Sequence, residues 1–311
     1  MVNKTELNKF YPTTVSVGIC AHNEEETIGP LLKSVLKQTQ ENFLLKEVFV
    51  VSDGSTDKTV MIAKTFNNPI IAIIDDRKRL GKAVRMNTIF TKASGDLLIL
   101  LDADIQLGNE DIFGLLVKGF ENNLKAGLIG GRIRPKEGRT LIEKSVNASV
   151  EIYQRFAAWF KEGHNVYNCN GPILALSKSL YRQIIIPYGV VADDTYLYFF
   201  ALSLGFEFQF IPPAFIWYRS PSSFLDQIHQ NRRYLFSKKQ LRNLFGDLFD
   251  REYLIPTYRY YLSFFIQFLK SPLYTFFIFI LNLYARFLIQ DSKITDKWET
   301  IKSTKGGLFN E

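Results

Sequence analysis

Asp102 and Asp104 are separated by a single alanine and follow directly after the apolar run 97–101. Two carboxylates at this spacing can converge on one hard cation. Such cations usually bind one or two protein carboxylates, while substrate phosphates and waters complete the shell. The pair therefore predicts a site for Mn²⁺ or Mg²⁺. For the tripeptide taken alone, the alternative is a turn with two solvated aspartates.

Polar residues also follow two earlier apolar runs of the chain. Asn23 and Glu24 come after the first run, and Asp53 comes at the end of the second. Asparagine suits a tight turn, and acidic residues favour the N-terminus of a helix. Each group alone is typical of the turn that connects a strand to a helix. Together with the two aspartates above, they predict polar strand ends along one crevice.

The elements that would position these residues alternate along the chain. Apolar, β-branched runs predict strands and helically spaced segments predict helices; the strands are 15–21, 48–52, 69–75 and 96–102, and the helices 26–38, 56–66 and 82–94. The strands lack polar alternation, so both faces of each would be buried. This order predicts an α/β fold with a doubly wound, mainly parallel sheet, whose ligands bind beyond the carboxyl ends of the strands.

The pattern is looser after residue 110. Residues 130–139 predict a Gly- and Arg-rich loop or strand edge. Arg132 and Arg134 in this segment could contact an anionic acceptor, although a solvated loop is the simpler interpretation. Asp193 and Asp194 precede a helical segment and would cap it in the simplest interpretation.

The composition is that of a folded chain with an excess of positive charge. Of 311 residues, 47% are hydrophobic and 22% charged, and the formal net charge is +7. This charge suits an anionic partner such as a nucleotide, a nucleic acid or an anionic membrane surface. Cys20 and Cys169 are far apart, which implies neither a disulfide framework nor a zinc cluster and favours a reducing compartment.

At this point the chain resembles the family 2 glycosyltransferases, which have the GT-A nucleotide-sugar fold. The matching motifs span residues 15–240: Ala21-His22-Asn23-Glu24, Ser52-Asp53-Gly54-Ser55, Gly81-Lys82-Ala83 with Asn87, Asp102-Ala103-Asp104, Asn170-Gly171-Pro172, Asp193-Asp194 and Gln230-Asn231-Arg232-Arg233-Tyr234. No single motif is specific, whereas seven motifs in this order with sensible spacing are.

The resemblance implies roles for the matching residues. Asp53 would bind the donor base, Asp102 would lie near the ribose and the metal shell, and Asp104 would ligate the metal directly. Asp194 would be the general base. The full set of implied donor contacts is Ala21, Asn23, Glu24, Asp53, Lys82, Asp102 and Arg233, and the implied acceptor or sugar contacts are Gly171, Asp193, Gln230 and Tyr234.

The chemistry of sugar transfer agrees with this set of residues. A divalent ion on the diphosphate stabilises the leaving group. A carboxylate near the acceptor hydroxyl can accept its proton, which is worth about 10²–10⁴-fold in rate. With one base and no enzyme nucleophile, the displacement would invert the anomeric centre.

The Gln230 motif matches the Gln-x-x-Arg-Trp pattern of the branch that contains hyaluronan synthase, cellulose synthase and ceramide glucosyltransferase. Arg233 would contact the diphosphate, because a guanidinium group suits phosphate geometry. Tyr234 stands where that branch usually has Trp, which weakens the prediction of a sugar-stacking platform. The alternative is a basic helix face toward solvent or lipid headgroups.

Two apolar, aromatic-rich segments, 253–269 and 273–289, follow the motifs. The second would be roughly 25 Å long as a helix, which is at the short limit for a membrane span. Lysines flank the pair on both sides and place both ends on the cytoplasmic side: Lys238, Lys239, Lys293, Lys297, Lys302 and Lys305. We therefore expect interfacial or re-entrant helices at the cytoplasmic face of the cell membrane. Helices packed on the domain or in an oligomer are the alternative.

The sequence as a whole predicts a GT-A catalytic domain at 1–240 and a membrane-associated helical region with a basic tail at 241–311. The predicted activity is inverting, metal-dependent sugar transfer from a nucleotide-diphosphate sugar, preferably a UDP-sugar, to a hydroxyl of a lipid, lipid-linked or glycan acceptor. No nucleic-acid partner is expected. One alternative is a nucleotidyltransferase, which would need a Gly-rich phosphate loop that residues 21–26 do not provide. The other is a non-catalytic scaffold that binds sugar nucleotides.

Asp104→Ala should abolish metal-dependent donor binding and leave the fold intact, because a turn residue after a strand contributes little packing. Calorimetric titration of a nucleotide sugar with Mn²⁺ present and absent measures this. An unchanged affinity in the variant would contradict the assignment of Asp104 as a metal ligand.

Overall fold

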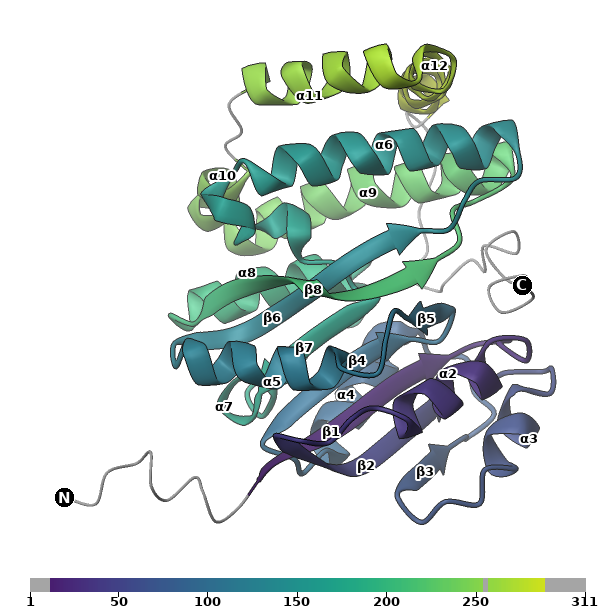
Figure 1. Cartoon of the computed structure of the whole chain (residues 1–311), viewed down its shortest axis with the longest axis vertical. Coiled ribbons are helices and arrows are strands. Elements are labelled where there is room, and N and C mark those ends of the chain that lie inside the picture. The colour runs from purple at the N-terminus through teal and green to yellow at the C-terminus, as the bar shows by residue number, and fades with distance from the viewer. Residues whose placement is uncertain (1–11, 254–256, 289–311) are drawn as a thin grey trace.

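The computed structural model describes residues 12–253 and 257–288, and its centre is one twisted eight-stranded sheet (Figure 1). The strand order is β3-β2-β1-β4-β7-β6-β8-β5. The strands, in chain order, are β1 Thr13–Ala21, β2 Phe43–Ser52, β3 Ile71–Ile74, β4 Leu97–Asp102, β5 Ile105–Leu107, β6 Ala126–Pro135, β7 Ile173–Ser177 and β8 Glu207–Tyr218.

The two halves of the sheet differ in strand direction. Strands β1 to β4 are all parallel, as the alternation of strands and helices predicted. Strand β7 is antiparallel to both β4 and β6, and β5 is antiparallel to β8. The sheet is therefore mixed, and the mainly parallel pattern holds for its first half. Because β7 reverses direction between them, β4 and β6 run the same way, and their carboxyl ends lie at the same edge.

Helices cover both faces of the sheet. On one face, α2 (Ile28–Leu36), α3 (Thr59–Lys64) and α5 (Ile112–Asn122) share a buried core with β1, β2 and β4. On the other face, the core is formed with α4 (Lys82–Lys92), α7 (Lys178–Tyr181), α8 (Asp193–Ser203) and α10 (Asp247–Glu252). The even residues of β4, which end with Asp102, point to this second face.

Helix α4 approaches the sheet closely over Gly18 of β1. A Cβ atom at Gly18 would lie 2.5 Å from Cγ2 of Ile89 and 3.2 Å from Cδ2 of Leu100. Atoms this close overlap, so only glycine allows the helix to pack at this depth. The approach brings Lys82, the first residue of α4, next to the carboxyl end of β4.

Further helices lie beyond the second half of the sheet (Figure 1). Helices α6 (Leu141–Ala158) and α9 (Phe224–Phe245) are nearer the sheet, and α11 (Thr257–Lys270) and α12 (Pro272–Leu288) lie outside them. Helix α12 packs Ile278 and Leu281 against Val146 of α6. The predicted domain boundary at residue 240 falls inside α9, which continues to Phe245.

Both predicted apolar segments are helical within the described residues. Arg155 of α6 fixes α11 by donating hydrogen bonds to the Ser263 carbonyl oxygen at 3.0 Å and to Gln267 Oε1 at 3.1 Å. The outward sides of the two helices carry large exposed apolar residues: Tyr258, Tyr261, Leu262, Phe265, Phe268, Leu269, Leu273, Phe276, Phe279, Ile280, Leu283 and Tyr284. We call this set the α11–α12 apolar face.

None of the helices in residues 12–253 and 257–288 combines the length and the apolar content that a membrane crossing requires. The predicted basic tail, with Lys293, Lys297, Lys302 and Lys305, lies outside the described residues.

Candidate active site

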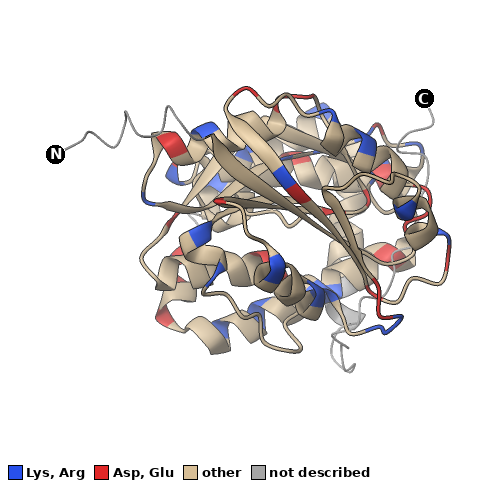
Figure 2. Ribbon diagram, turned by 90° about the horizontal axis from the view of Figure 1, so that it is seen from below, with Lys and Arg blue, Asp and Glu red and all other residues tan. Residues whose placement is uncertain are grey.

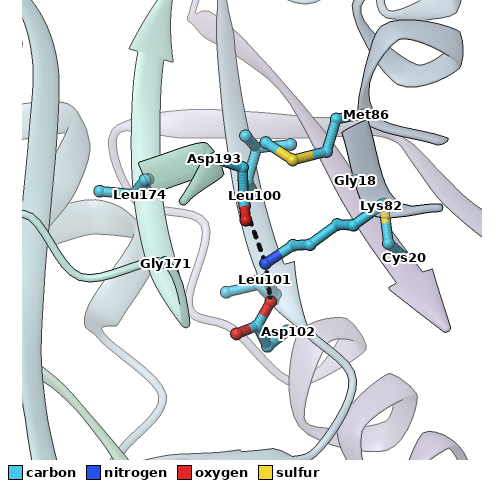
Figure 3. Close-up of a pocket in the computed structure, with 10 residues that line it drawn as sticks. All are labelled: Gly18, Cys20, Lys82, Met86, Leu100, Leu101, Asp102, Gly171, Leu174 and Asp193. Atoms are coloured by element: carbon cyan, nitrogen blue, oxygen red, sulfur yellow. Dashed lines mark hydrogen bonds and ion pairs between the residues drawn. The ribbon is translucent and has the colours of Figure 1, made fainter. Parts of the chain in front are cut away.

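A small pocket opens at the carboxyl ends of β1 and β4 (Figure 3). Asp102 ends β4 and pairs with Cys20 of β1 across the parallel ladder. Gly171, which precedes β7, and Asp193, which begins α8, complete the polar side of the pocket. Three strands and two helices from both halves of the chain meet here, and of the polar strand-end residues predicted for this edge the pocket includes Asp102.

The ammonium group of Lys82 lies between two carboxylates in this pocket (Figure 3). Its Nζ atom is 2.7 Å from Asp102 Oδ1 and 2.9 Å from Asp193 Oδ2. All three side chains are largely buried. Burial by itself would lower the pKa of Lys82, but the two carboxylates outweigh it and raise this pKa above its ordinary value. The lysine is thus a permanent cation that joins the end of β4 to the start of α8.

Asp194 is oriented by three hydrogen bonds. Its Oδ2 accepts from the Gly171 amide at 3.1 Å, and its Oδ1 accepts from the Thr195 amide at 2.6 Å and from Thr195 Oγ1 at 3.2 Å. Burial, followed by the negative charge of Asp193, raises the pKa of Asp194. A fixed carboxylate with a raised pKa is a stronger proton acceptor than a solvated one.

Asp104 lies in the turn between β4 and β5 and is partly exposed. Asp102 and Asp104 offer two carboxylates separated by one residue of the chain, and the described residues contain no group of three or more His, Cys, Asp or Glu side chains that could hold a metal. This donor set fits a cation such as Mg²⁺, which needs only one or two protein carboxylates when substrate phosphates supply other ligands. The predicted metal ligands are therefore compatible with a metal that arrives with its substrate.

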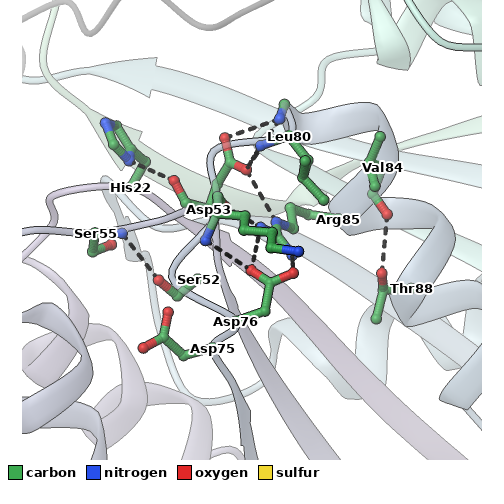
Figure 4. Close-up of polar contacts among 12 residues, drawn as sticks. His22, Ser52, Asp53, Ser55, Asp75, Asp76, Leu80, Val84, Arg85 and Thr88 are labelled. Carbon is green, nitrogen blue, oxygen red and sulfur yellow. Dashed lines mark hydrogen bonds and ion pairs between the residues drawn. The ribbon is translucent and has the colours of Figure 1, made fainter.

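Asp53 is 1% exposed, and protein groups surround its carboxylate (Figure 4). It accepts hydrogen bonds from the Leu80 amide at 2.7 Å, the Gly81 amide at 3.0 Å and Arg85 Nε at 3.0 Å. Arg85 also binds Asp76 through both terminal nitrogens. Asp53 thereby holds the segment that leads into Lys82. Its predicted contact with the donor base stays a prediction.

The other donor residues predicted at the strand ends connect the turn after β1 to the segment after β2. Asn23 has a left-handed backbone with φ of 56°, and its Oδ1 accepts from the Thr56 amide at 2.8 Å. Glu24 donates its amide hydrogen to Thr59 Oγ1 at 2.7 Å, and its carboxylate accepts from Thr27. Ala21 is fully buried at the end of β1. These contacts shape the crevice edge, and a donor contact for each residue remains a prediction.

The predicted Gln230 motif lies on α9. Arg233 Nη2 donates to the Val191 carbonyl oxygen at 3.4 Å, two residues before Asp193. Gln230 is half-buried, and Tyr234 is 61% exposed. The structure thus places Arg233 near the segment that carries the acidic pair, and contacts with sugar or diphosphate remain predictions.

Two buried polar residues were missed by the sequence analysis. Arg85, 2% exposed, binds Asp53, and His22 Nδ1 lies 2.8 Å from the Asp53 carbonyl oxygen. A signal existed for Arg85, because it precedes the buried Ile89 by one helical turn and so lies on the core side of α4. The sequence contained no comparable signal for the position of Lys82 between Asp102 and Asp193, which depends on contacts between distant segments.

Comparison with known proteins places this geometry in a family. The sequence profile of glycosyl transferase family 2 matches residues 16–185, which is more than half of the chain. A probable glycosyltransferase of Bacillus subtilis, YdaM, is 27% identical over 299 residues that cover 87% of this chain and 66% of that protein. The undecaprenyl-phosphate 4-deoxy-4-formamido-L-arabinose transferase of Proteus mirabilis is 33% identical over 143 residues, covering 44% of this chain and 43% of that protein.

A solved structure shares the fold. The mannosyltransferase of Pyrobaculum calidifontis, solved in complex with GDP-Man and Mn²⁺, has a TM-score of 0.60 and 19% identity, covering 91% of this chain and 77% of that one. The chain spans just under two thirds of the Bacillus relative and less than half of the Proteus one. Because the profile extends from β1 through β7 and contains the pocket aspartate Asp102, the protein belongs to glycosyl transferase family 2, as its motifs predicted.

Proposed function

We propose that the protein is an inverting, divalent-metal-dependent glycosyltransferase. It transfers a sugar from a nucleoside-diphosphate sugar, with UDP-sugars expected first, to a hydroxyl of a lipid, lipid-linked or glycan acceptor. The observation that carries the proposal is the pocket in which Lys82 bridges Asp102 of the donor-side motif and Asp193 of the acceptor-side motif. Family membership supports the reaction class.

Asp102 and Asp104 act on the donor side of the reaction. These two carboxylates would hold Mn²⁺ or Mg²⁺ against the diphosphate of the donor. The bound ion would supply charge neutralisation for the departing nucleoside diphosphate. Lys82 keeps Asp102 at the strand end by a 2.7 Å ion pair, so this ligand is already in place before the donor binds.

The acceptor side falls to Asp194. In the proposed step, the acceptor hydroxyl oxygen bonds to the anomeric carbon, the bond from this carbon to the diphosphate oxygen breaks, and the hydroxyl proton moves to Asp194. Each carboxylate oxygen retains lone-pair capacity beyond the amide bonds that orient it. Attack opposite the leaving group inverts the anomeric configuration.

We further propose that the α11–α12 apolar face rests on the cytoplasmic surface of a membrane. Its exposed side chains include Phe265 at 56%, Phe276 at 57% and Leu273 at 64%. Exposed apolar residues gathered on two adjacent helices of a folded chain usually contact another apolar phase. The Proteus relative is named for an undecaprenyl-phosphate substrate, which supports a lipid-linked acceptor for this protein also.

The reaction is tested with a panel of UDP- and GDP-sugars, measuring nucleoside diphosphate release with Mn²⁺ and with a chelator. We expect release from at least one donor only when the metal is present, and a product whose anomeric proton coupling shows inversion. Asp194→Asn should lower transfer by roughly 10²-fold or more because the base is lost, with donor affinity nearly unchanged. Wild-type transfer by this variant, or retention of configuration, would contradict the proposal.

The pH dependence follows from the carboxylate pair. Transfer requires ionised Asp194, so the rate should fall as pH decreases through its raised pKa. Asp193→Asn removes a neighbouring negative charge and should lower the pKa of Asp194, moving the acid limb of kcat/KM to lower pH by about one unit. Lys82 keeps Asp102 as a partner in the variant. An acid limb that stays in place or moves to higher pH would refute Asp194 as the base.

The membrane proposal is tested by the double substitution Phe265→Ser/Phe276→Ser. Both side chains point outward, so their loss should reduce binding to vesicles containing anionic lipid without lowering the thermal unfolding midpoint. Flotation of the intact protein and the variant measures this. The substitution Leu124→Ser is the matched control, because Leu124 is 91% exposed away from these helices. Equal flotation of all three proteins would rule out this face as the membrane contact.

A further inference from the structure

Strand β6 carries three basic residues on one face: Arg132, Arg134 and Lys136, the last just beyond the strand end. We call them the β6 basic ladder. Each cation lies over an aromatic ring of β8. Arg132 is 6.0 Å from the Phe210 ring centre, Arg134 is 3.9 Å from that of Phe215, and Lys136 is 5.7 Å from that of Trp217. The sequence predicted a loop or strand edge here. In the structure the two arginines lie in strand β6, and all three cations lie over aromatic rings of β8.

The ladder has no acidic partner among the residues that the structure describes. The nearby cation Arg219 has such a partner, since its Nε is 2.9 Å from Glu143 Oε1. No carboxylate within residues 12–253 and 257–288 lies within 4.0 Å of a ladder nitrogen. All three side chains are half-buried. Burial, followed by the charge of Arg134, lowers the pKa of Arg132. Basic and acidic residues are otherwise interspersed around the fold (Figure 2). The ladder is therefore a local excess of positive charge, and a bound anion would neutralise it.

The sheet register puts β6, which carries the ladder, two strands from β4, which ends in Asp102. Gly130 pairs with Leu174 of β7, and Leu174 pairs with Leu100 of β4. Two residues further along each strand come Arg132 of β6 and Asp102 of β4, and the β6–β8 register shifts between Gly131 and Arg132. At the paired positions β4 and β6 are two strands apart, which is roughly 10 Å. Gly171, which precedes the intervening strand β7, donates its amide hydrogen to Asp194.

A second polar feature shares the row of Arg134. Arg134 pairs with Trp217 of β8, and Trp217 pairs with Gln106 of β5. Side chains paired across strands lie on one face. Gln106 Oε1 is buried and accepts no hydrogen bond from any described residue. Buried polar atoms are normally satisfied, so this row is suited to a ligand that also brings a hydrogen-bond donor.

We propose that the β6 basic ladder binds a phosphate ester on the acceptor, and that this anion holds the acceptor with its reacting hydroxyl toward Asp194. The proposal rests on the proposed function, because it assigns the acceptor side to this half of the sheet. Two guanidinium groups and one ammonium group match the oxygens and charge of a phosphate ester. The phosphate could belong to a lipid headgroup or to a soluble phosphorylated acceptor.

Binding is measured in the absence of donor, so the result is independent of transfer. Three probes are compared, and together they test the phosphate contact alone, without a reacting acceptor hydroxyl: phosphatidylcholine vesicles containing a polyprenyl phosphate, the same vesicles containing the matching polyprenol, and glycerol 3-phosphate in solution. We expect the intact protein to prefer a phosphate probe over the polyprenol vesicles. Arg132→Gln and Arg134→Gln should each weaken phosphate binding about tenfold or more, and Arg132→Lys should retain most of it.

Lys118→Gln is the matched control, because Lys118 is an exposed cation on α5, which covers the other face of the sheet. It removes the same charge and should leave phosphate binding unchanged. Thermal unfolding midpoints separate a lost site from a lost fold. If Arg134→Gln does not fold, Arg132→Gln, whose ring contact is longer, decides the question.

The binding measurements distinguish the source of the phosphate and also whether the ladder binds phosphate at all. Binding of polyprenyl phosphate alone supports the proposal with a lipid source, binding of glycerol 3-phosphate alone supports a soluble source, and binding of both supports the shared phosphate chemistry. Equal binding of polyprenol and polyprenyl phosphate, no binding of any phosphate probe, or phosphate binding that survives Arg132→Gln/Arg134→Gln overturns it. The donor panel remains a separate test, since nucleotide release without phosphate binding would refute only the ladder.

Discussion

The buried contact of Lys82 with Asp102 and Asp193 is the interaction on which the site depends. It joins the last residue of a parallel strand to the first residue of α8, two points 91 residues apart in the chain. Two carboxylates this close and largely buried would repel each other without the cation, and their desolvation would be uncompensated. Lys82 therefore allows an acidic donor side and an acidic acceptor side to exist within one small pocket.

The packing below the site holds this lysine in place. Gly18 lets α4 lie close to β1, and Asp53 fixes the two residues before Lys82 through their amides. Arg85, one turn along the same helix, binds Asp53 and Asp76. The Asp53 motif thus stabilises the start of α4, whatever it contributes to donor binding. A long charged side chain such as that of Lys82 needs supporting contacts around it, because it can otherwise adopt other rotamers away from the site.

The sequence was sufficient for what depends on local pattern. Buried runs and turn residues predicted the four parallel strands, and the acidic residues at their ends were expected at one edge, where Asp102 lies. The antiparallel insertion of β7 was not predictable in this way, and the segment 130–139 was predicted only as a loop or strand edge, whereas β6 continues to Pro135. Glycines and arginines in that segment are poor strand formers, and pairing with β7 and β8 overrides their propensity. The Lys82 bridge and the aromatic backing of Arg134 were missed for the same reason, because both join distant segments.

The most direct test of this account is a double-mutant cycle on the free energy of unfolding, using Lys82→Met and Asp193→Asn, measured by urea denaturation at neutral pH. The account predicts that Lys82→Met alone lowers the free energy of unfolding by about 3–5 kcal/mol, because two largely buried carboxylates lose their cation. The double variant should lose less than the sum of the single losses, with a coupling of about 1 kcal/mol or more. Losses that add to within about 0.5 kcal/mol would contradict the claim that Lys82 joins the two sides of the site.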